Sequence, residues 1–241
     1  MAGSSAVTAQ GTPRLRPDGR PDVRTFFVPV GACEIADTWH TAGLRGTGSH
    51  DWQVADVFVP EEHSFPILFS GPSEPGALSA RDFVPHGGAR VAAVALGIAR
   101  DAIDTFTALA MTKTPALATS TLATQHTTHE RVGRAEALLR AGRAFLYDTV
   151  RALPHSPHWS AELSDELRAR IRLASAHAAQ SAAEAVDLMF NAAGTTATYT
   201  SSRLERCFRD VHVATQHVAV APSNIEMVGQ YLLGLGLQAR R

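Results

Sequence analysis

From residue 80 onward, apolar side chains recur at three- and four-residue spacing through four long, alanine-rich segments. This spacing is typical of helices that bury one face. The sequence predicts helices over 88–111 and 125–153, a third from Ser160 or Ser164 to about Ala192, and a fourth over 203–235 that Pro222 interrupts. Four long helices joined by short or moderate loops favour an up-and-down four-helix bundle over residues 80–241, so the chain is expected to be mainly α.

The first part of the chain carries a different pattern, with short apolar or alternating runs at 23–30, 33–38 and 52–60. Such runs, bounded by proline and glycine, are typical of strands. A sheet of two or three strands is marginal alone. We therefore interpret residues 23–62 as an incomplete antiparallel β-domain that lies on the helices, on another chain or on sequence that is missing. Residues 1–22 are small and polar, and are expected to form a flexible tail.

The formal net charge is -1 at pH 7, so the chain has no basic field that would attract nucleic acid. No apolar run is long enough to span a bilayer, and the N-terminal residues lack the charged and apolar regions of a signal peptide. Cys33 and Cys207 lie far apart with no CxxC motif, which favours free thiols in a reducing compartment. We expect a soluble, cytoplasmic protein that binds neither nucleic acid nor a membrane.

The fourth helical segment sets polar groups into a face that is otherwise apolar. They are Arg209, Asp210, His212, Gln216 and His217. Burying such groups costs energy unless partners satisfy them, and polar groups that crowd a helix break often mark a ligand site. A buried histidine beside a break is more often structural than catalytic, so the residues alone leave both interpretations open. Ser223 and Glu226 form a capping-box pattern that restarts the helix after Pro222.

Other motifs are weaker. The run GLRGTGS at 43–49 suggests a phosphate loop, but no Gly-Lys-Ser/Thr follows and the run leads into a strand, so a tight turn is favoured. His126, His129 and Glu130 could present metal ligands, yet a polar first helical turn without HExxH is more typical of a solvated helix start. No metal site is predicted. The glycine and hydroxyl groups at 191–200 suit contacts to a phosphate and equally suit ordinary C-capping.

Three segments, taken together, resemble the acyl-CoA dehydrogenase superfamily. They are DTWHTAGLRGTGSHDWQVADVFVPEE at 37–62, FNAAGTTATYTSSRLERCFRD at 190–210 and VHVATQHVAVAPSN at 211–224. Within the superfamily they are most similar to the flavin-dependent monooxygenase branch, of the p-hydroxyphenylacetate hydroxylase and dibenzothiophene monooxygenase type. The resemblance covers nearly all of the chain after residue 23, and it corresponds to the last part of the β-domain and the C-terminal bundle of family members.

One position separates the two branches. Many acyl-CoA dehydrogenases keep a glutamate after Arg-Asp that abstracts the substrate α-proton, and this glutamate falls on Val218 here. Valine cannot accept a proton, so the dehydrogenation mechanism lacks its base. The monooxygenase branch has a histidine that matches His217, which the resemblance implies as the proton-handling residue. In that role the His217 imidazole is expected to face a cavity near Gly194.

The resemblance also implies further site residues. Gly194, Thr195 and Thr196 match a segment whose backbone approaches the flavin phosphates, often in a neighbouring subunit. Lys113, the only lysine in the chain, lies near where the family places a basic residue on a partner subunit's flavin phosphate. Ser49 and His50 follow the glycine-rich turn where dehydrogenases have residues near the active site. Trp39 belongs to the same motif.

The implied function is that of the C-terminal part of a two-component flavin monooxygenase. Reduced FMN or FAD would come from a separate flavin reductase, and one atom of O2 would pass to a small substrate that is expected to be aromatic. Assembly into a dimer or tetramer through the bundle is expected from the family. Two alternatives remain open: a non-catalytic, truncated oligomerisation module of the same fold, and an acyl-CoA dehydrogenase-type flavoprotein with a relocated base.

Overall fold

The computed structural model describes residues 2–5, 12–16, 19, 21–65, 83–153 and 164–237. The chain divides into two compact units. The β unit comprises Met1–His40, Arg45–Phe83 and Ser156–Ser160, and the helical unit comprises Thr41–Leu44, Val84–His155 and Ala161–Arg241. Each unit is described separately below. The short stretch Thr41–Leu44 belongs to the helical unit although its neighbours in sequence belong to the β unit.

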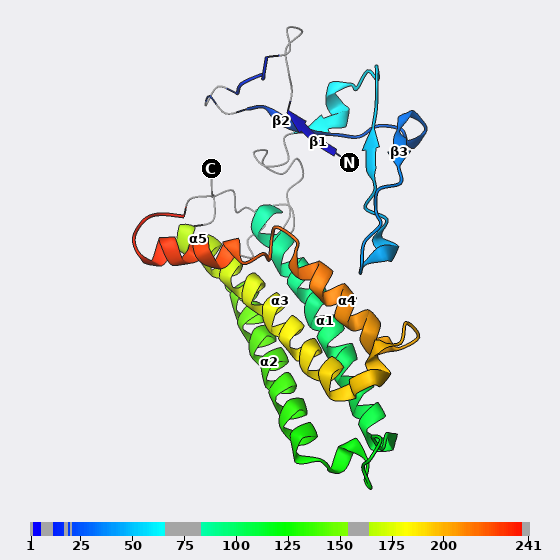
Figure 1. Cartoon of the computed structure of the whole chain (residues 1–241). Helices are drawn as coiled ribbons and strands as arrows, with labels where there is room; N and C mark the ends of the chain where they lie inside the picture. The colour runs from blue at the N-terminus through cyan, green and yellow to red at the C-terminus, as the bar shows by residue number, and fades with distance from the viewer. Residues whose placement is uncertain are drawn as a thin grey trace. The chain divides into compact units, whose positions relative to one another are not determined.

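The helical unit contains four long antiparallel helices that run alternately up and down, with a shorter fifth helix at one end (Figure 1). The helices are α1 (Phe83–Thr112), α2 (His126–Arg151), α3 (Asp165–Ala193), α4 (Arg203–Thr215) and α5 (Ser223–Leu232), with short 3₁₀ turns at Leu122–Thr124 and Gly194–Thr198. The predicted mainly α bundle is confirmed. Within the described part of the chain, no helix combines the length and apolar character needed to cross a membrane.

Alanine makes close packing around α3 possible. Ala174, Ala178, Ala182 and Ala185 are fully buried along this helix. A Cβ added to Gly142 of α2 would lie 3.2 Å from the Ala178 Cα, so the two helices approach closely at this point. Larger apolar side chains fill the space between the other helices, among them Phe106, Leu146, Met189, Leu204 and Val211. Removing this apolar surface from water is the main source of stability for the bundle.

The ends of α3 agree with the sequence pattern, whereas the junction of α4 and α5 does not. Ser164 caps α3 by accepting the Leu167 N–H at 3.3 Å, and Gly194 ends the helix with φ 58°. We expected the fourth helix to continue to Pro222, but α4 ends at Thr215. The predicted capping box is also wrong, because Pro222 is the N-cap of α5 and Ser223 already lies inside the helix.

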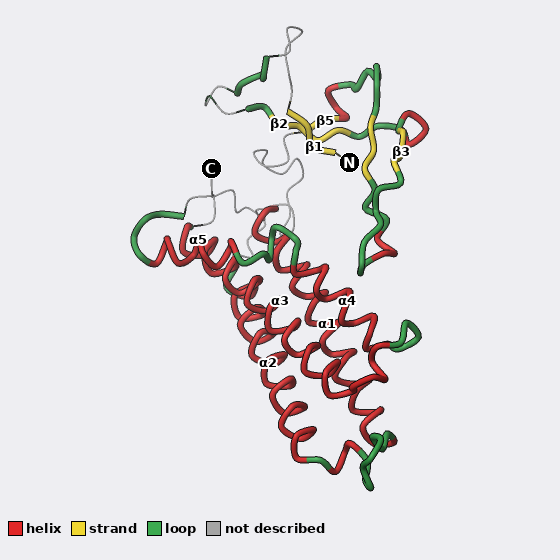
Figure 2. The backbone as a smooth tube through the Cα atoms, viewed as in Figure 1, coloured by secondary structure: helices red, strands yellow, loops and turns green. Residues whose placement is uncertain are grey.

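The β unit contains two small antiparallel sheets (Figure 2). The first has the order β1-β2-β5 and joins Ala2–Ser5, Val23–Phe26 and Ser64–Phe65. In its register, Ala2 pairs with Phe26 and Thr25 pairs with Phe65. The second sheet pairs β3 (Glu34–Ala36) with β4 (Asp51–Gln53), with Ile35 opposite Trp52. Three short 3₁₀ turns complete the unit, at Val30–Ala32, Arg45–Thr47 and Glu61–His63.

The strands are shorter than the sequence pattern predicts. The first predicted strand ends at Phe26, before Pro29, which lacks the N–H that a ladder needs. The strand expected over 52–60 is wrong beyond Gln53, since Asp56 takes φ 51° and Phe58 is 88% exposed. A left-handed residue cannot continue a strand. Ala2–Ser5, in the segment expected to be a flexible tail, forms β1.

Candidate functional site

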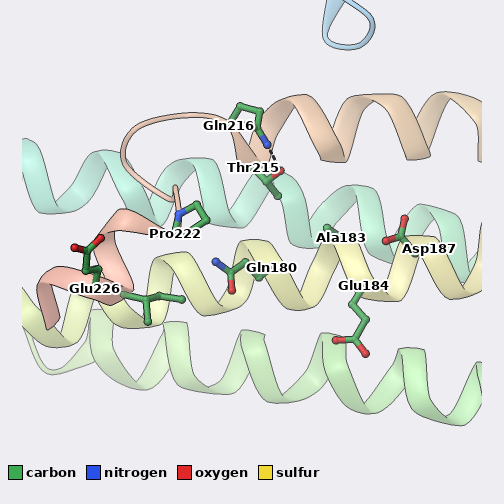
Figure 3. A pocket seen from close by; sticks show the side chains of 9 residues that line it. Gln180, Ala183, Glu184, Asp187, Thr215, Gln216, Pro222 and Glu226 are labelled. Atoms are coloured by element: carbon green, nitrogen blue, oxygen red, sulfur yellow. Dashed lines mark hydrogen bonds between the residues drawn. The ribbon is translucent and has the colours of Figure 1, made fainter. Parts of the chain in front are cut away.

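A cavity of about 730 Å³ lies where α3 passes the junction of α4 and α5 (Figure 3). Its lining residues are Gln180, Ala183, Glu184, Asp187, Thr215, Gln216, Pro222, Ile225 and Glu226. The Glu184 carboxylate turns toward α2, where it pairs with Arg134 at 2.7 Å (Figure 3). The break in the fourth predicted helix therefore does border a cavity, although the histidine predicted to act there does not line it.

His212 makes a pair with Asp187 at the edge of this cavity. Its Nε2 lies 2.8 Å from the Asp187 Oδ1. The imidazole also packs edge-on against Phe208, with ring centroids 4.6 Å apart, and Phe208 stacks on Phe190 of α3 at 4.4 Å. The His212 ring is thus held by Asp187 of α3 on its polar side and by Phe208 of its own helix on its apolar side. This arrangement is that of a satisfied structural histidine, one of the two interpretations that the sequence leaves open.

Arg209 and Asp210 turn away from the cavity and hold the stretch Thr41–Leu44. The Asp210 Oδ1 accepts the Leu44 N–H at 2.6 Å, and the Arg209 Nη1 donates to the Ala42 carbonyl. Glu205 fixes the Arg209 guanidinium at 2.9 Å, and its hydrogen bond raises the pKa of that guanidinium. The five polar groups of the fourth segment therefore do not converge on one ligand.

Gly43 allows the stretch Thr41–Leu44 to lie directly against α4. A Cβ at this position would lie 2.3 Å from the Arg209 carbonyl oxygen and 2.8 Å from the Asp210 nitrogen. No side chain fits at such distances, so only glycine allows the stretch to reach the α4 backbone. The beginning of the 43–49 motif thus serves packing against a helix rather than phosphate binding.

His217 is exposed in the loop 216–222 that follows α4. Its Nδ1 accepts the Ala219 N–H at 3.1 Å, so a neutral imidazole carries its proton on Nε2. Gly194 precedes α4 and His217 follows it. The 13 residues of α4 between them span about 20 Å. The expectation that His217 faces a cavity near Gly194 is therefore wrong within one chain.

The structure does bring together Lys113 and the segment after α3. The Lys113 Nζ donates to the Ala193 carbonyl at 2.5 Å and to the Thr196 Oγ1 at 2.6 Å. Gly194 and Thr195 are exposed, and nothing lies within 4 Å of a Cβ built on Gly194. The ammonium stabilises the carbonyl end of α3. Its third N–H and the threonine hydroxyls are donors of the kind that phosphate oxygens accept, so these residues fit a flavin phosphate.

Trp39, Ser49 and His50 gather in one turn of the β unit. The His50 Nδ1 accepts the backbone N–H of Thr38 at 3.2 Å and that of Trp39 at 3.1 Å. The Ser49 Oγ lies 3.3 Å from the Thr47 Oγ1. Because both amides point at Nδ1, His50 orders this turn, and Nε2 is the nitrogen left for contact with a ligand.

His126 and His129, at the start of α2, have partners in the helix and in the 3₁₀ turn that precedes it. The His129 Nε2 lies 2.7 Å from the Ala123 carbonyl oxygen, and His126 packs against the His129 ring. In the ranges that the structure describes, no group of three or more His, Cys, Asp or Glu side chains could hold a metal ion. His155 and His158 lie outside the described residues.

Sequence reasoning missed Asn224, which is buried and bonded to the loop that carries His217. It also missed the Asp187–His212 pair. The only signal for Asn224 was a small polar residue placed two positions after Pro222, where helix starts commonly carry such residues.

A sequence profile of the family described as "Acyl-CoA dehydrogenase, C-terminal domain" matches residues 89–222, more than half of the chain. The chain belongs to this family. The match confirms the superfamily to which the three sequence segments pointed, and it lies on the helices that form the bundle.

Individual members of the superfamily are similar over most of this chain. An indole-3-acetate monooxygenase of Pseudomonas putida is 31% identical over 211 residues, which cover 88% of this chain and 54% of that protein. The flavin-dependent monooxygenase, oxygenase subunit HsaA, of Mycobacterium tuberculosis is 30% identical over 261 residues, covering 95% of this chain and 60% of that protein. The chain thus spans little more than half the length of the curated relatives it matches.

The fold is shared with solved structures of the superfamily. XiaF from a Streptomyces species, in complex with FADH2 and glycerol, superposes with a TM-score of 0.78 and 26% sequence identity, over 95% of this chain and 60% of that chain. The family assignment is therefore supported by sequence and by architecture, including the short strands that precede the bundle.

Proposed function

We propose that this chain is the C-terminal part of a flavin-dependent monooxygenase that hydroxylates a small aromatic substrate. The single observation that carries the proposal is the pair His217–Val218. Family members that oxidise carbon–carbon bonds keep a glutamate where this chain has Val218, and Val218 is 77% exposed at the surface of the loop. The adjacent imidazole matches the histidine of the monooxygenase branch. The names of the similar proteins in Pseudomonas and Mycobacterium support the same choice.

His217 is proposed to hold and transfer the proton that hydroxylation of an aromatic ring requires. Its Nδ1 accepts the Ala219 N–H, so Nε2 is the nitrogen available to a bound molecule. An imidazole has one nitrogen that can donate a proton and one that can accept it, which allows both steps in one catalytic cycle. Ser49 and His50 are proposed as further polar groups at the substrate, with Trp39 shaping the turn that carries them.

Reduced FMN or FAD, when bound, supplies the electrons with which O2 is activated. Lys113 and Thr196 are proposed to hold a phosphate group of the flavin, with Gly194 and Thr195 leaving space beside it. The hydrogen bonds from Lys113 to Ala193 and Thr196 order this segment before any ligand binds. The FADH2 in XiaF supports a reduced flavin. The oxygenase-subunit name of HsaA supports a separate flavin reductase as transient partner.

His217 lies at one end of α4, and the cluster of Lys113, Ala193 and Thr196 (the Lys113 cluster) lies at the other. A single flavin site within one chain therefore cannot contact both. We propose that two copies of the chain contribute them to a shared site, within a dimer or tetramer assembled through the bundle.

The experiment that tests this function measures flavin binding and oxygen transfer separately. The purified chain is incubated with FMN or FAD and dialysed, and retained flavin is measured by absorbance. A flavin reductase, NADH, ¹⁸O2 and a panel of phenols and indoles are then added, and products are analysed by mass spectrometry. Incorporation of one ¹⁸O atom supports the proposal, whereas oxidation of an acyl-CoA by the bound flavin would assign the chain to the dehydrogenases.

The second candidate function is a non-catalytic assembly module of the same fold. The separation of His217 from the Lys113 cluster favours it, because neither group is enclosed within one chain. This alternative predicts a helical oligomer that stays colourless after incubation with FMN or FAD. Retention of flavin in proportion to subunits would exclude it.

A further inference from the structure

We propose that Asn224, assisted by Gly88, is the positioning residue that fixes the loop 216–222 and thereby the orientation of the His217 imidazole. The inference rests on the proposed role of His217, but the geometry on which it stands is independent of any reaction. Gly88 lies outside the three segments that carry the family resemblance, and Asn224 is the last residue of the third segment.

Asn224 is 1% exposed, and its side chain makes two hydrogen bonds to the loop and one to α3. Its Nδ2 donates to the Val218 carbonyl at 2.8 Å and to the Ala221 carbonyl at 3.1 Å. Its Oδ1 accepts from the Arg172 Nη1 of α3 at 3.0 Å. A buried amide that bonds two separate points of a loop acts as a cross-link, because breaking either bond would leave a buried polar group unpaired.

The bonds of Asn224 reach the residues next to His217. The His217 carbonyl accepts the N–H groups of Val220 at 2.9 Å and Ala221 at 3.0 Å, and its own N–H donates to the Ala214 carbonyl at 3.2 Å. The loop is therefore wound tightly around His217. Val220 anchors the loop in the core because its side chain is fully buried, whereas Val218 is 77% exposed. At Val218 the hydrogen bond from Asn224 to the backbone carbonyl therefore adds to that anchor.

Gly88 of α1 supports the loop from the other side. A Cβ at Gly88 would lie 2.9 Å from the Ala219 carbonyl oxygen and 3.2 Å from the Ser175 Cβ of α3. The Ala219 N–H is the group that donates to the His217 Nδ1 at 3.1 Å. A methyl group at Gly88 would displace the Ala219 carbonyl. The shift of Ala219 would then disturb the hydrogen bond from its N–H to the His217 Nδ1, which orients the imidazole.

The proposal predicts a specific tautomer that depends on these residues. Long-range ¹H–¹⁵N correlation spectra at pH 8 report which ring nitrogen of His217 carries the proton, and hydrogen exchange reports protection of the Ala219 amide. In the unchanged chain, we expect Nδ1 to be unprotonated and the Ala219 amide to be protected. In Asn224→Ala and in Gly88→Ala, we expect a mixture of both tautomers and a loss of Ala219 protection of at least about tenfold.

Two matched variants serve as controls. Asn191→Ala removes an exposed asparagine whose Nδ2 bonds only the Asp187 carbonyl, and Gly97→Ala adds a methyl group on α1 where nothing lies within 4 Å. Both should leave the His217 tautomer and the Ala219 protection unchanged. Circular dichroism reports folding of each variant, and Gly88→Ala carries the test if Asn224→Ala fails to fold.

The outcome is separable from that of the proposed function. Unchanged His217 tautomer and Ala219 protection in folded Asn224→Ala and Gly88→Ala would overturn the positioning role, whatever their activity. An altered tautomer supports that role, and ¹⁸O incorporation in the same variants then tests His217 itself. Altered tautomer with full oxygen transfer would reject the catalytic role of His217 while leaving the positioning role intact.

Discussion

The Asp210 carboxylate accepts the backbone N–H of Leu44 at 2.6 Å, although the two residues are 166 positions apart in sequence. This bond, with that from Arg209 to the Ala42 carbonyl, joins the stretch Thr41–Leu44 to α4. The Arg-Asp pair of the family motif therefore has a structural task in this chain. It holds the stretch Thr41–Leu44 on the helix that leads to His217.

Gly43→Ala should lower the free energy of unfolding of the helical unit by about 1–3 kcal/mol, the usual cost of overpacking a tight contact. The added methyl group meets the Arg209 carbonyl oxygen at 2.3 Å and must displace Thr41–Leu44. Urea denaturation measures the change, and tryptic cleavage after Arg45 should become faster. Gly46→Ala is the control, because nothing lies within 4 Å of its Cβ. Equal stability of the two variants would contradict the packing role of Gly43.

The helices of the bundle were predictable because their signal is local. The sequence offers Ser160 or Ser164 as the cap of α3, and Ser164 is the residue that caps it, while the end predicted at about Ala192 lies one residue before the observed end at Ala193. The end of α4 was not predictable from Pro222. The chain leaves the helix at Thr215 because backbone turns and the buried Asn224 amide pair with the polar backbone groups of the loop. Asn224 belongs to α5 and is bonded to Arg172 of α3, so these contacts depend on residues outside α4.

The candidate site was predictable only in part. The family resemblance singled out Lys113 and Thr196 separately, and the structure joins the two side chains within one chain, although nothing local in the sequence connects residues 83 positions apart. The polar groups of α4 were expected to share one ligand. Instead His212 pairs with Asp187 of α3 and Asp210 accepts the Leu44 N–H, and such long-range partners leave no pattern in the sequence of α4. Arg209 pairs with Glu205, four residues earlier on the same helix.

Lys113→Met should weaken both the bundle and flavin binding. Loss of two charge-assisted hydrogen bonds to Ala193 and Thr196 predicts a decrease of about 1–3 kcal/mol in the free energy of unfolding. Retained FMN or FAD after dialysis should fall, whereas Lys113→Arg keeps the cation and should bind more flavin than Lys113→Met. Flavin retention that is the same in all three proteins would show that Lys113 serves only to cap α3.

The stability of the α1–α2 contact should depend on pH through Glu136. Hydrogen bonds from Arg140 and then Arg100 lower the pKa of Glu136 from its usual 4.5. A carboxyl whose pKa is lower in the folded than in the unfolded state stabilises the fold when the pH is above the unfolded-state pKa. That contribution is lost as the pH falls through the folded-state pKa. Glu136→Gln should therefore cost up to about 1 kcal/mol at pH 7, with the difference shrinking between pH 5 and pH 3.

Urea titrations of the unchanged chain and Glu136→Gln across this pH range measure the difference. Glu130→Gln, on the exposed start of the same helix, is the control. A difference between Glu136→Gln and the unchanged chain that is constant from pH 7 to pH 3 would contradict the ion-pair assignment.

The two cysteines should differ sharply in reactivity. Burial, reinforced by the nearby Asp101 carboxylate, raises the pKa of Cys207 to about 12. At pH 8 this lowers its thiolate fraction about a thousandfold relative to a thiol with the usual value of 9.0. Ellman's reagent should modify the half-buried Cys33 of the native protein and leave Cys207 unmodified until denaturant is added. Rapid modification of both thiols in the native protein would contradict the buried environment of Cys207.

The central claim is that this chain contributes a proton-handling histidine to oxygen transfer from a reduced flavin. The most direct measurement compares ¹⁸O incorporation from ¹⁸O2 into phenol and indole substrates by the unchanged chain and by His217→Gln, with reduced flavin from a reductase. We predict a product with one ¹⁸O atom in the unchanged chain and a decrease of about a hundredfold in His217→Gln, the effect of losing a general acid–base group. Equal ¹⁸O incorporation by the two proteins, or none by the unchanged chain, would contradict the claim.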